Sequence, residues 1–269
     1  MPNKNIKKIN GIPLIVYTIR EVLKLKKYYY KFIVSTDSKK IARISEKAGA
    51  CVPFIRPKRL ALDTTPTFPV LRHALKYIEK NDKVNIDWLL TLQATCPFTK
   101  ANDIKKCIKL INKNIDSIVS VREGNECHPM YLNIKKGKYL KPFQPKFKFL
   151  RRQDISPTIY RFNGSIFLSK RKIILNSKDN TFFGGKMLPY IMPKERSFDI
   201  DSAFDLNLIK VNLVKRQNKC EEELNKVSQR LDNKSFIDRA PKNIVDQEKT
   251  NYSDLKNDIQ KIMLTIKSL

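Results

Sequence analysis

Helical and strand patterns alternate along residues 13–214, and this alternation restricts the fold more than any other feature of the chain. Apolar residues three or four positions apart, together with helix start and stop residues, predict helices at 13–27, 38–47, 69–79 and 101–111. Short runs rich in β-branched and aromatic residues predict strands at 31–37, 51–55, 88–92, 117–121 and 160–168. Such alternation predicts an α/β domain whose mostly parallel sheet carries helices on both faces.

Two of the predicted strands end in polar residues, which are S-T-D at 35–37 and Q-A-T at 93–95. In sheets of this class ligands bind at the carboxyl ends of strands, so we expect both groups to face a binding site. The alternation breaks between 123 and 160, where a hairpin pattern precedes an aromatic, proline-rich run. We interpret this stretch as an insertion that forms a dimer arm, and therefore expect a homodimer.

The last 53 residues, 217–269, follow a different pattern. Their apolar residues repeat with the spacing of a coiled-coil seam, at Cys220, Leu224, Val227 and Leu231 and again from Val245 to Leu269. The segment 232–242, which contains Pro241, interrupts the seam. We predict an antiparallel two-helix hairpin, with a domain boundary between 216 and 217. A single amphipathic helix packed on the sheet is the alternative.

Charge is distributed unevenly between these two parts. The whole chain has a formal net charge of +28, yet residues 217–269 hold ten basic and nine acidic residues. A positive field over residues 1–216 favours a polyanionic substrate such as a nucleoside triphosphate, although nucleic acid is an alternative. The chain contains no apolar run of about 18 residues that would predict a membrane span. Five scattered cysteines indicate reduced thiols and a cytoplasmic setting.

The stretch R-S-F-D-I-D-S-A-F-D-L at 196–206 concentrates acids in this basic chain. On a strand, Asp199 and Asp201 would share one face, because side chains alternate with a period of two. Ser202 and Asp205 predict a capping box at the start of a helix. The first two carboxylates are then free to bind Mg²⁺, which takes one or two carboxylates and completes its shell with water and phosphate oxygens. Two solvated acids on an edge strand are the alternative.

Several ordered motifs run through residues 1–214. They are P-N-K-N-I (2–6), N-G-I-P-L-I-V-Y-T-I (10–19), I-V-S-T-D (33–37), R-P (56–57), L-A-L-D-T-T (60–65), L-Q-A-T-C-P-F (92–98), R-R-Q-D (151–154), Y-R-F-N-G-S-I-F (160–167), N-T-F-F (180–183) and S-F-D-I-D-S-A-F-D-L (197–206). With these motifs, residues 1–214 resemble the acylneuraminate cytidylyltransferases, the family that includes CMP-sialic, CMP-legionaminic and CMP-pseudaminic acid synthetases. The resemblance implies a Rossmann-like nucleotidyltransferase sheet.

The resemblance also implies a reaction, in which CMP passes from CTP to an acidic nine-carbon 2-keto sugar and pyrophosphate leaves. By similarity, Asp199 and Asp201 hold Mg²⁺, and Lys4 and Asp201 are the catalytic residues. The nucleotide-binding residues implied are Lys4, Asn5, Arg56 and Thr67, and the sugar-binding residues are Gln93, Arg152, Tyr160, Arg161, Asn163, Phe182 and Phe183. The two phenylalanines would receive an acyl methyl group, with a plain core role as the alternative. For Arg152 the alternative is a solvated surface position.

Residues 217–269 resemble the C-terminal tRNA-binding arm of valyl-tRNA synthetases. The matching residues are E-E-E-L-N-K-V (221–227), L-D-N-K-S-F-I-D-R-A-P-K-N-I-V (231–245) and L-K-N-D-I-Q-K-I (255–262). This resemblance implies tRNA as a further partner.

The cytidylyltransferase family places an apolar strand and a glycine-containing loop just before P-x-K-N, and these have no counterpart between Met1 and Lys4. We therefore expect the sheet to lack one central strand. Three hypotheses remain open: a CMP-sugar synthetase, an inactive truncated fusion product, and a tRNA-associated binding protein that acts through its C-terminal arm.

Overall fold

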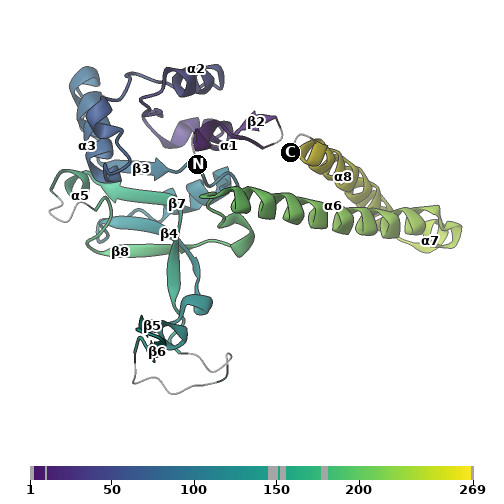
Figure 1. Ribbon diagram of the computed structural model, residues 1–269. Helices are drawn as coiled ribbons and strands as arrows, with labels where there is room; N and C mark the ends of the chain where they lie inside the picture. Colours follow the sequence, from purple (N-terminus) through teal and green to yellow (C-terminus); the bar gives the residue numbers. More distant parts are fainter. Residues whose placement is uncertain (1–2, 10, 145–150, 152–155, 177–180, 268–269) are drawn as a thin grey trace. The chain divides into compact units, whose positions relative to one another are not determined.

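The computed structural model describes residues 3–9, 11–144, 151, 156–176 and 181–267. The chain divides into two compact units (Figure 1). The larger unit is Ile15–Asp199, which we call the body. The smaller unit consists of Met1–Leu14 together with Ile200–Leu269. We call the helical part of this second unit the arm. In the described residues no helix is long and apolar enough to cross a membrane.

The body contains a four-stranded sheet with the order β3-β7-β4-β8. These strands are β3 (Trp88–Leu92), β4 (Ser117–Glu123), β7 (Tyr160–Lys170) and β8 (Met187–Ile191). β7 runs antiparallel to both β3 and β4, whereas β4 and β8 are parallel. The predicted α/β class is confirmed, but the prediction of a mostly parallel sheet is wrong.

The connection between β4 and β7 explains this difference. Its described residues form two 3₁₀ turns, Asn125–Cys127 and Pro129–Tyr131, and the predicted hairpin of β5 (Asn133–Lys136) and β6 (Tyr139–Pro142). A parallel partner for β4 would need a crossover, usually a helix, whereas an antiparallel partner needs none. The hairpin insertion therefore returns the chain as an antiparallel strand.

Two other strand predictions differ from the structure, and one strand was not predicted. The segments 31–37 and 51–55 are joined by two isolated parallel bridges, Ile33 with Cys51 and Thr36 with Ile55, instead of a continuous ladder. β8 was not predicted, because Pro189 lies within it and proline lacks the N–H that a ladder uses. An edge position, which β8 occupies in this sheet, tolerates that loss.

The predicted helices are confirmed with small changes at their ends. They are α1 (Leu14–Leu23), α2 (Lys39–Lys47), α3 (Thr67–Asp82) and α4 (Ala101–Lys109), and a short α5 (Arg171–Asn176) follows β7. Ser38 caps α2 by accepting a hydrogen bond from the N–H of Ile41. Gly49, two residues beyond α2, has a φ of +94°, which ends the helix as predicted. Further 3₁₀ turns are Lys4–Ile6, Lys26–Tyr28, Lys58–Leu60 and Lys194–Arg196.

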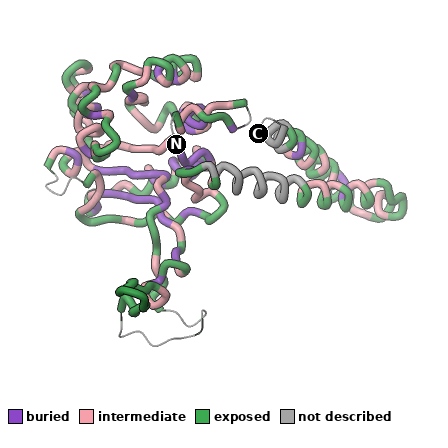
Figure 2. Tube along the Cα trace, viewed as in Figure 1, coloured by how far each residue is buried: buried purple, intermediate pink, exposed green. Residues whose placement is uncertain are grey.

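The core of the body lies between the sheet and two helices. Val22 near the end of α1 and Ile104 of α4 pack with Ile118 of β4 and with Ile166 and Leu168 of β7. Figure 2 shows the buried stretches of these strands in purple. Because side chains alternate along a strand, Phe167 faces the opposite side of the sheet. There it meets the aromatic residues Phe182 and Phe183, which precede β8.

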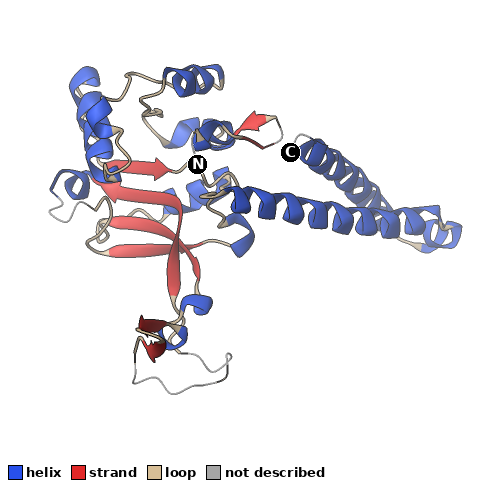
Figure 3. Cartoon of the chain, in the orientation of Figure 1, coloured by secondary structure: helices blue, strands red, loops and turns tan. Residues whose placement is uncertain are grey.

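The second unit begins with the short pair β1 (Lys8–Ile9) and β2 (Ile12–Pro13). Its remainder is helical: α6 (Ala203–Asp232), α7 (Lys234–Arg239) and α8 (Lys242–Lys267). Figure 3 shows α6 and α8 returning along each other as a hairpin, with α7 at the turn. Val227, Val245 and Ile259 of the predicted seam are buried, so the helical hairpin is confirmed.

α6 also shows where the predicted domain boundary falls. The helix starts with the predicted capping box, in which Ser202 and Asp205 each accept a hydrogen bond from the other's N–H. It then continues without interruption past residues 216 and 217, where the composition changes. The change in charge therefore occurs inside one helix.

Candidate active site

Lys4 and Asp201 form an ion pair within the second unit, although they lie 197 residues apart in the chain. The Lys4 Nζ atom is 2.7 Å from Asp201 Oδ1. The Asp201 side chain remains 70% exposed, while that of Lys4 is 28% exposed. Asn5 lies in the same 3₁₀ turn as Lys4 and is half-buried. A largely exposed carboxylate beside an ammonium group leaves both charges accessible to a phosphate and its cation.

Residues 197–201 form no strand ladder, so the predicted strand is wrong at this point, yet the predicted alternation of faces is visible. Ile200 is fully buried, and Phe198 packs edge-on against Phe98 with ring centroids 6.3 Å apart. Asp199 is half-buried and Asp201 is exposed. Apolar contacts therefore anchor this irregular segment.

Asp199 has one carboxylate oxygen without a protein partner. Its Oδ1 atom is buried and accepts no hydrogen bond from the described residues. A buried carboxylate oxygen without a protein donor is unusual, and such an atom can accept from water or bind a cation. The described residues contain no group of three or more His, Cys, Asp or Glu side chains that could enclose a metal. Mg²⁺ uses few carboxylates and takes its other ligands from phosphates and water, so the partnerless Oδ1 atom of Asp199 and the exposed carboxylate of Asp201 each suit it as a single ligand.

Arg56 lies beside the polar end of the segment 31–37. Its Nη2 atom is 3.2 Å from Asp37 Oδ1, and its backbone N–H donates to the carbonyl of Thr36 at 2.8 Å. The Arg56 Nε atom is buried and has no partner among the described residues. Thr67 is exposed and begins α3, where the first-turn N–H groups have no intrahelical partner. Both residues are available to a nucleotide.

The residues predicted to contact the sugar differ in exposure. Gln93 follows β3 directly and its backbone carbonyl accepts from the Cys96 N–H. Tyr160 and Arg161 begin β7 and are exposed. Asn163, in contrast, is 5% exposed. Arg152 lies outside the described residues, so its predicted role stays a prediction.

Asn163 already makes hydrogen bonds with both ends of its side-chain amide. Its Oδ1 atom accepts from Ser120 Oγ at 2.6 Å, and its Nδ2 atom donates to Ser197 Oγ at 2.9 Å. The Oδ1 atom also accepts from the backbone N–H of Ser165. These contacts connect β4 and β7 with the acidic segment at 197–201. Asn163 therefore helps to position that segment.

Phe182 and Phe183 belong to an aromatic cluster on the sheet face that carries Phe167. Phe183 lies 5.0 Å from Phe162 and 5.4 Å from Phe167, and Phe182 lies 4.8 Å from Phe167, all between ring centroids. Both Phe182 and Phe183 are half-buried, and Phe162 is 46% exposed. The cluster therefore presents an apolar surface instead of filling a closed core.

Asp103 is a residue that the motifs did not point to. It is 1% exposed and accepts two hydrogen bonds from Arg196, at 2.9 and 2.8 Å, and one from Tyr190 Oη at 2.9 Å. Burial alone would raise the pKa of Asp103, but the bonds from Arg196, the Lys100 N–H and Tyr190 outweigh it, so the pKa lies below its ordinary value. The available sequence signal was an acid in the first turn of a predicted helix.

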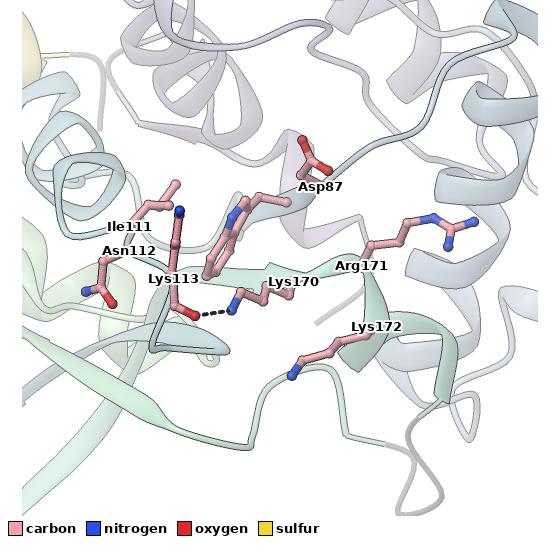
Figure 4. A pocket seen from close by; sticks show the side chains of 8 residues that line it. Asp87, Ile111, Asn112, Lys113, Lys170, Arg171 and Lys172 are labelled. Carbon is pink, nitrogen blue, oxygen red and sulfur yellow. Dashed lines mark hydrogen bonds between the residues drawn. The ribbon is translucent and has the colours of Figure 1, made fainter.

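A basic hollow lies at the other end of β3, away from Gln93 (Figure 4). It has a volume of about 740 Å³ and is lined by Trp88, Lys113, Lys170, Arg171 and Lys172, among others. Lys170 and Lys172 both pair with Asp116, and Arg171 pairs with Glu79. The hydrogen bond and charge of Lys172, with further donors, lower the pKa of Asp116 to about 2. Two carboxylates thus offset part of the charge of these four basic residues.

Comparison with known proteins identifies two regions. The family model described as cytidylyltransferase matches residues 1–201. A second model, described as the valyl tRNA synthetase tRNA binding arm, matches residues 205–269. The match therefore changes from one family to the other at the start of α6.

Individual relatives agree with this division. The post-translational flagellin modification protein B of Campylobacter coli is 34% identical over 218 residues, which are 80% of this chain and 90% of the relative. A CMP-N,N'-diacetyllegionaminic acid synthase of Campylobacter jejuni is 33% identical over 209 residues, 77% of this chain and 86% of that enzyme. The valine–tRNA ligase of Pelagibacter ubique is 67% identical over 69 residues, 26% of this chain but 8% of the ligase.

Proposed function

Because the chain belongs to the cytidylyltransferase family, we propose that it transfers CMP from CTP to an acidic nine-carbon 2-keto sugar of the sialic acid type, for surface glycan synthesis. The similarity to the CMP-N,N'-diacetyllegionaminic acid synthase of Campylobacter jejuni supports this substrate class. The observation that carries the proposal is the pair of carboxylates in the D-I-D motif. One has an orphan oxygen at Asp199, and the other lies beside the Lys4 ammonium at Asp201.

In the proposed reaction, the anomeric hydroxyl of the sugar attacks the α-phosphorus of CTP. A new P–O bond forms to the sugar, the bond between the α-phosphorus and the bridging oxygen breaks, and pyrophosphate leaves. Negative charge builds up on the phosphate oxygens, so fixed cations lower the barrier. Lys4 supplies one such cation, and its distance of 2.7 Å from Asp201 keeps it close to the carboxylate that would bind the metal.

Asp199 and Asp201 would hold Mg²⁺, which when bound neutralises phosphate charge and orients the triphosphate. Asn5, Arg56 and Thr67 would bind the nucleotide. Gln93, Tyr160, Arg161 and the undescribed Arg152 would bind the sugar, and a guanidinium group suits its carboxylate. Phe182 and Phe183 would receive an acyl methyl group on their half-buried rings.

Pyrophosphate release tests this proposal directly. The protein would be incubated with Mg²⁺, CTP and N-acetylneuraminic, legionaminic or pseudaminic acid in parallel. We expect release with one of the three sugars and a loss of at least about a hundredfold in kcat for Asp201→Ala. The matched control is Asp246→Ala, an exposed acid of α8, which should retain activity. Absence of release with all three sugars would favour the inactive fusion product, and full activity of Asp201→Ala would exclude the metal role.

The exposed hairpin supports a homodimer as a further part of the proposal. All eight residues of β5 and β6 are exposed, and Ile134, Tyr139 and Leu140 are 49%, 65% and 69% exposed. A two-stranded hairpin is marginally stable in water without further packing. Light scattering should therefore show a dimer for the natural protein and a monomer for Leu140→Asp. The control Lys141→Asp, which lies on the opposite face of the hairpin from Leu140, should remain dimeric.

The match of residues 205–269 to a tRNA binding arm supports a second candidate function, which is tRNA binding. Lys234, Arg239 and Lys242 are exposed at and beside α7, at the turn of the hairpin. Basic side chains that contact phosphates contribute salt-dependent affinity. A gel shift with total tRNA should lose the complex when these three residues are changed to Glu. An unchanged shift would count against binding through the arm.

A further inference from the structure

The acidic segment is fixed residue by residue at its amino-terminal side. Arg196 donates two hydrogen bonds to the buried Asp103, Ser197 accepts one from Asn163, and Phe198 packs on Phe98. Each of these partners belongs to the body, as does Asp199 itself. The chain therefore reaches Asp199 with its direction already fixed by three consecutive contacts.

Asp199 then lies against a glycine that leaves room for its carboxylate. A Cβ atom added to Gly164 would be 3.0 Å from Asp199 Oδ2 and 3.7 Å from Cys96 Sγ. Such a distance from Oδ2 is shorter than ordinary van der Waals contacts, so a side chain at 164 would displace the carboxylate. Gly164 also has a φ of +74°, in the left-handed region that favours glycine. Its neighbour Asn163 holds Ser197, so two successive residues of β7 act on the same acidic segment.

We infer that Asn163 and Gly164 are positioning residues that hold Asp199 with its Oδ1 atom directed to a divalent cation. The inference rests on the proposed function, because that function supplies the reason for a cation at Asp199. The orphan state of Oδ1 is the independent observation, since a carboxylate positioned only for packing would have its buried oxygens hydrogen-bonded. Residues that orient a metal ligand affect metal affinity about as strongly as some ligands do.

The alternative is that Gly164 and Asn163 stabilise the fold and have no effect on the cation. Binding of Mn²⁺ separates the two, because Mn²⁺ accepts the same oxygen ligands as Mg²⁺ and free Mn²⁺ is measured by electron paramagnetic resonance without any turnover. Thermal unfolding followed by the fluorescence of Trp88, the single tryptophan, reports the stability of each variant in parallel.

Gly164→Ala is the central variant, and Gly137→Ala is its matched control. Gly137 has a similar φ of +61°, but a Cβ atom there would meet nothing within 4 Å. We expect Gly164→Ala to weaken Mn²⁺ binding by about ten- to a hundredfold, while Gly137→Ala stays within about twofold of the natural protein. Ser197→Ala removes the hydrogen bond from Asn163 and the one that Ser197 Oγ donates to the Pro193 carbonyl, without adding any atom. It should weaken Mn²⁺ binding by about fivefold, within the range expected for a net hydrogen-bond loss.

The outcomes distinguish this inference from the proposed function. If the natural protein binds Mn²⁺ and both Gly164→Ala and Ser197→Ala bind it equally well, the positioning role is overturned while the metal site stands. If the natural protein itself does not bind Mn²⁺ with or without CTP, both the metal role of Asp199 and the inference fail. If Gly164→Ala does not fold, the affinity of Ser197→Ala for Mn²⁺ decides the question alone.

Discussion

The body and the arm differ in the range of the contacts that hold them. In the body, Arg196 and Tyr190 converge on Asp103 from about ninety residues further along the chain. In the arm, Val227, Val245 and Ile259 follow one seam, and the ion pair between Arg230 and Glu248 spans 18 residues. The body thus depends on a few buried polar contacts between distant segments, whereas the arm depends on a repeated local pattern. Four substitutions test this difference.

Asp103→Asn should have the largest effect. The change leaves the Arg196 guanidinium opposite an uncharged amide and weakens the hydrogen bonds that join α4 to the segment after β8. Because Asp103 is buried while Arg196 is 35% exposed, we expect a loss of about 3 kcal/mol, at the low end for a broken buried pair. Urea unfolding followed by Trp88 fluorescence measures it, and Asp87→Asn, at an exposed position, is the control.

The same contact predicts a pH dependence. The pKa of Asp103 is lowered in the folded protein, so its ionised form contributes stability above the ordinary carboxyl pKa of about 4. That contribution is lost as pH falls through the folded-state value. The difference in unfolding midpoint between the natural protein and Asp103→Asn should therefore be full at pH 7 and smaller at pH 3. A difference that stays constant would contradict the assignment.

Gly185→Ala should have the next largest effect. A Cβ atom at Gly185 would lie 2.6 Å from Asp116 Oδ2, and φ is +65°. We expect it to cost about 2 kcal/mol more than Gly137→Ala, which has the same backbone requirement but no neighbouring atom. Equal costs for the two variants in Trp88 unfolding would show that Asp116 moves aside easily, and would weaken the picture of a tightly packed body.

Val227→Ala should cost about 1–1.5 kcal/mol, because it removes two methyl groups from the buried seam between α6 and α8. Loss of helical circular dichroism on heating measures it, with Gln229→Ala at an exposed position as the control. If the Trp88 transition shifts by the same amount, body and arm unfold as one cooperative unit. In that case the stability of the body and that of the arm could not be distinguished.

Arg230→Ala should have the smallest effect, about 0.5 kcal/mol, because the Arg230 side chain is 60% exposed and its pair with Glu248 is screened by solvent. The loss should decrease further at 1 M NaCl, where charges are screened within about 3 Å. Lys226→Ala is the exposed control on the same helix. A loss above that of Val227→Ala would mean that a polar contact, and not the apolar seam, holds the arm together.

This difference in range also explains which features the sequence predicts. The seam, the capping box of Ser202 and the strand β3 depend on residues close together in the chain, and each prediction was confirmed. The direction of β7 depends on how the insertion returns, which no local pattern specifies. The roles of Asp103 and Tyr190 were missed for the same reason, since their contact joins α4 to β8.

The candidate site shows the same limit. The residue types of the D-I-D segment pointed to a cation, but the pairing of Lys4 with Asp201 across 197 residues was not predicted, since the family motifs named each residue separately. Asn163 was predicted from its motif to touch the sugar, and this stays a prediction; its burial and the hydrogen bonds that its amide makes within the protein were not predicted. Whether a polar residue of a motif is buried depends on tertiary packing, which the sequence of the motif alone does not specify.

The unbroken course of α6 has a practical consequence for anyone who trims the protein. A cut at the change in composition, after residue 216, would leave a stub of about 14 residues, near the lower limit for a helix in water, and would discard α8, against which α6 packs. The frayed stub would loosen the Ser202 cap and, one residue earlier, Asp201. Loss of activity in such a truncated protein would therefore not show whether the arm binds tRNA. Substitutions of exposed residues at α7, the turn of the hairpin, test tRNA binding without disturbing Asp201.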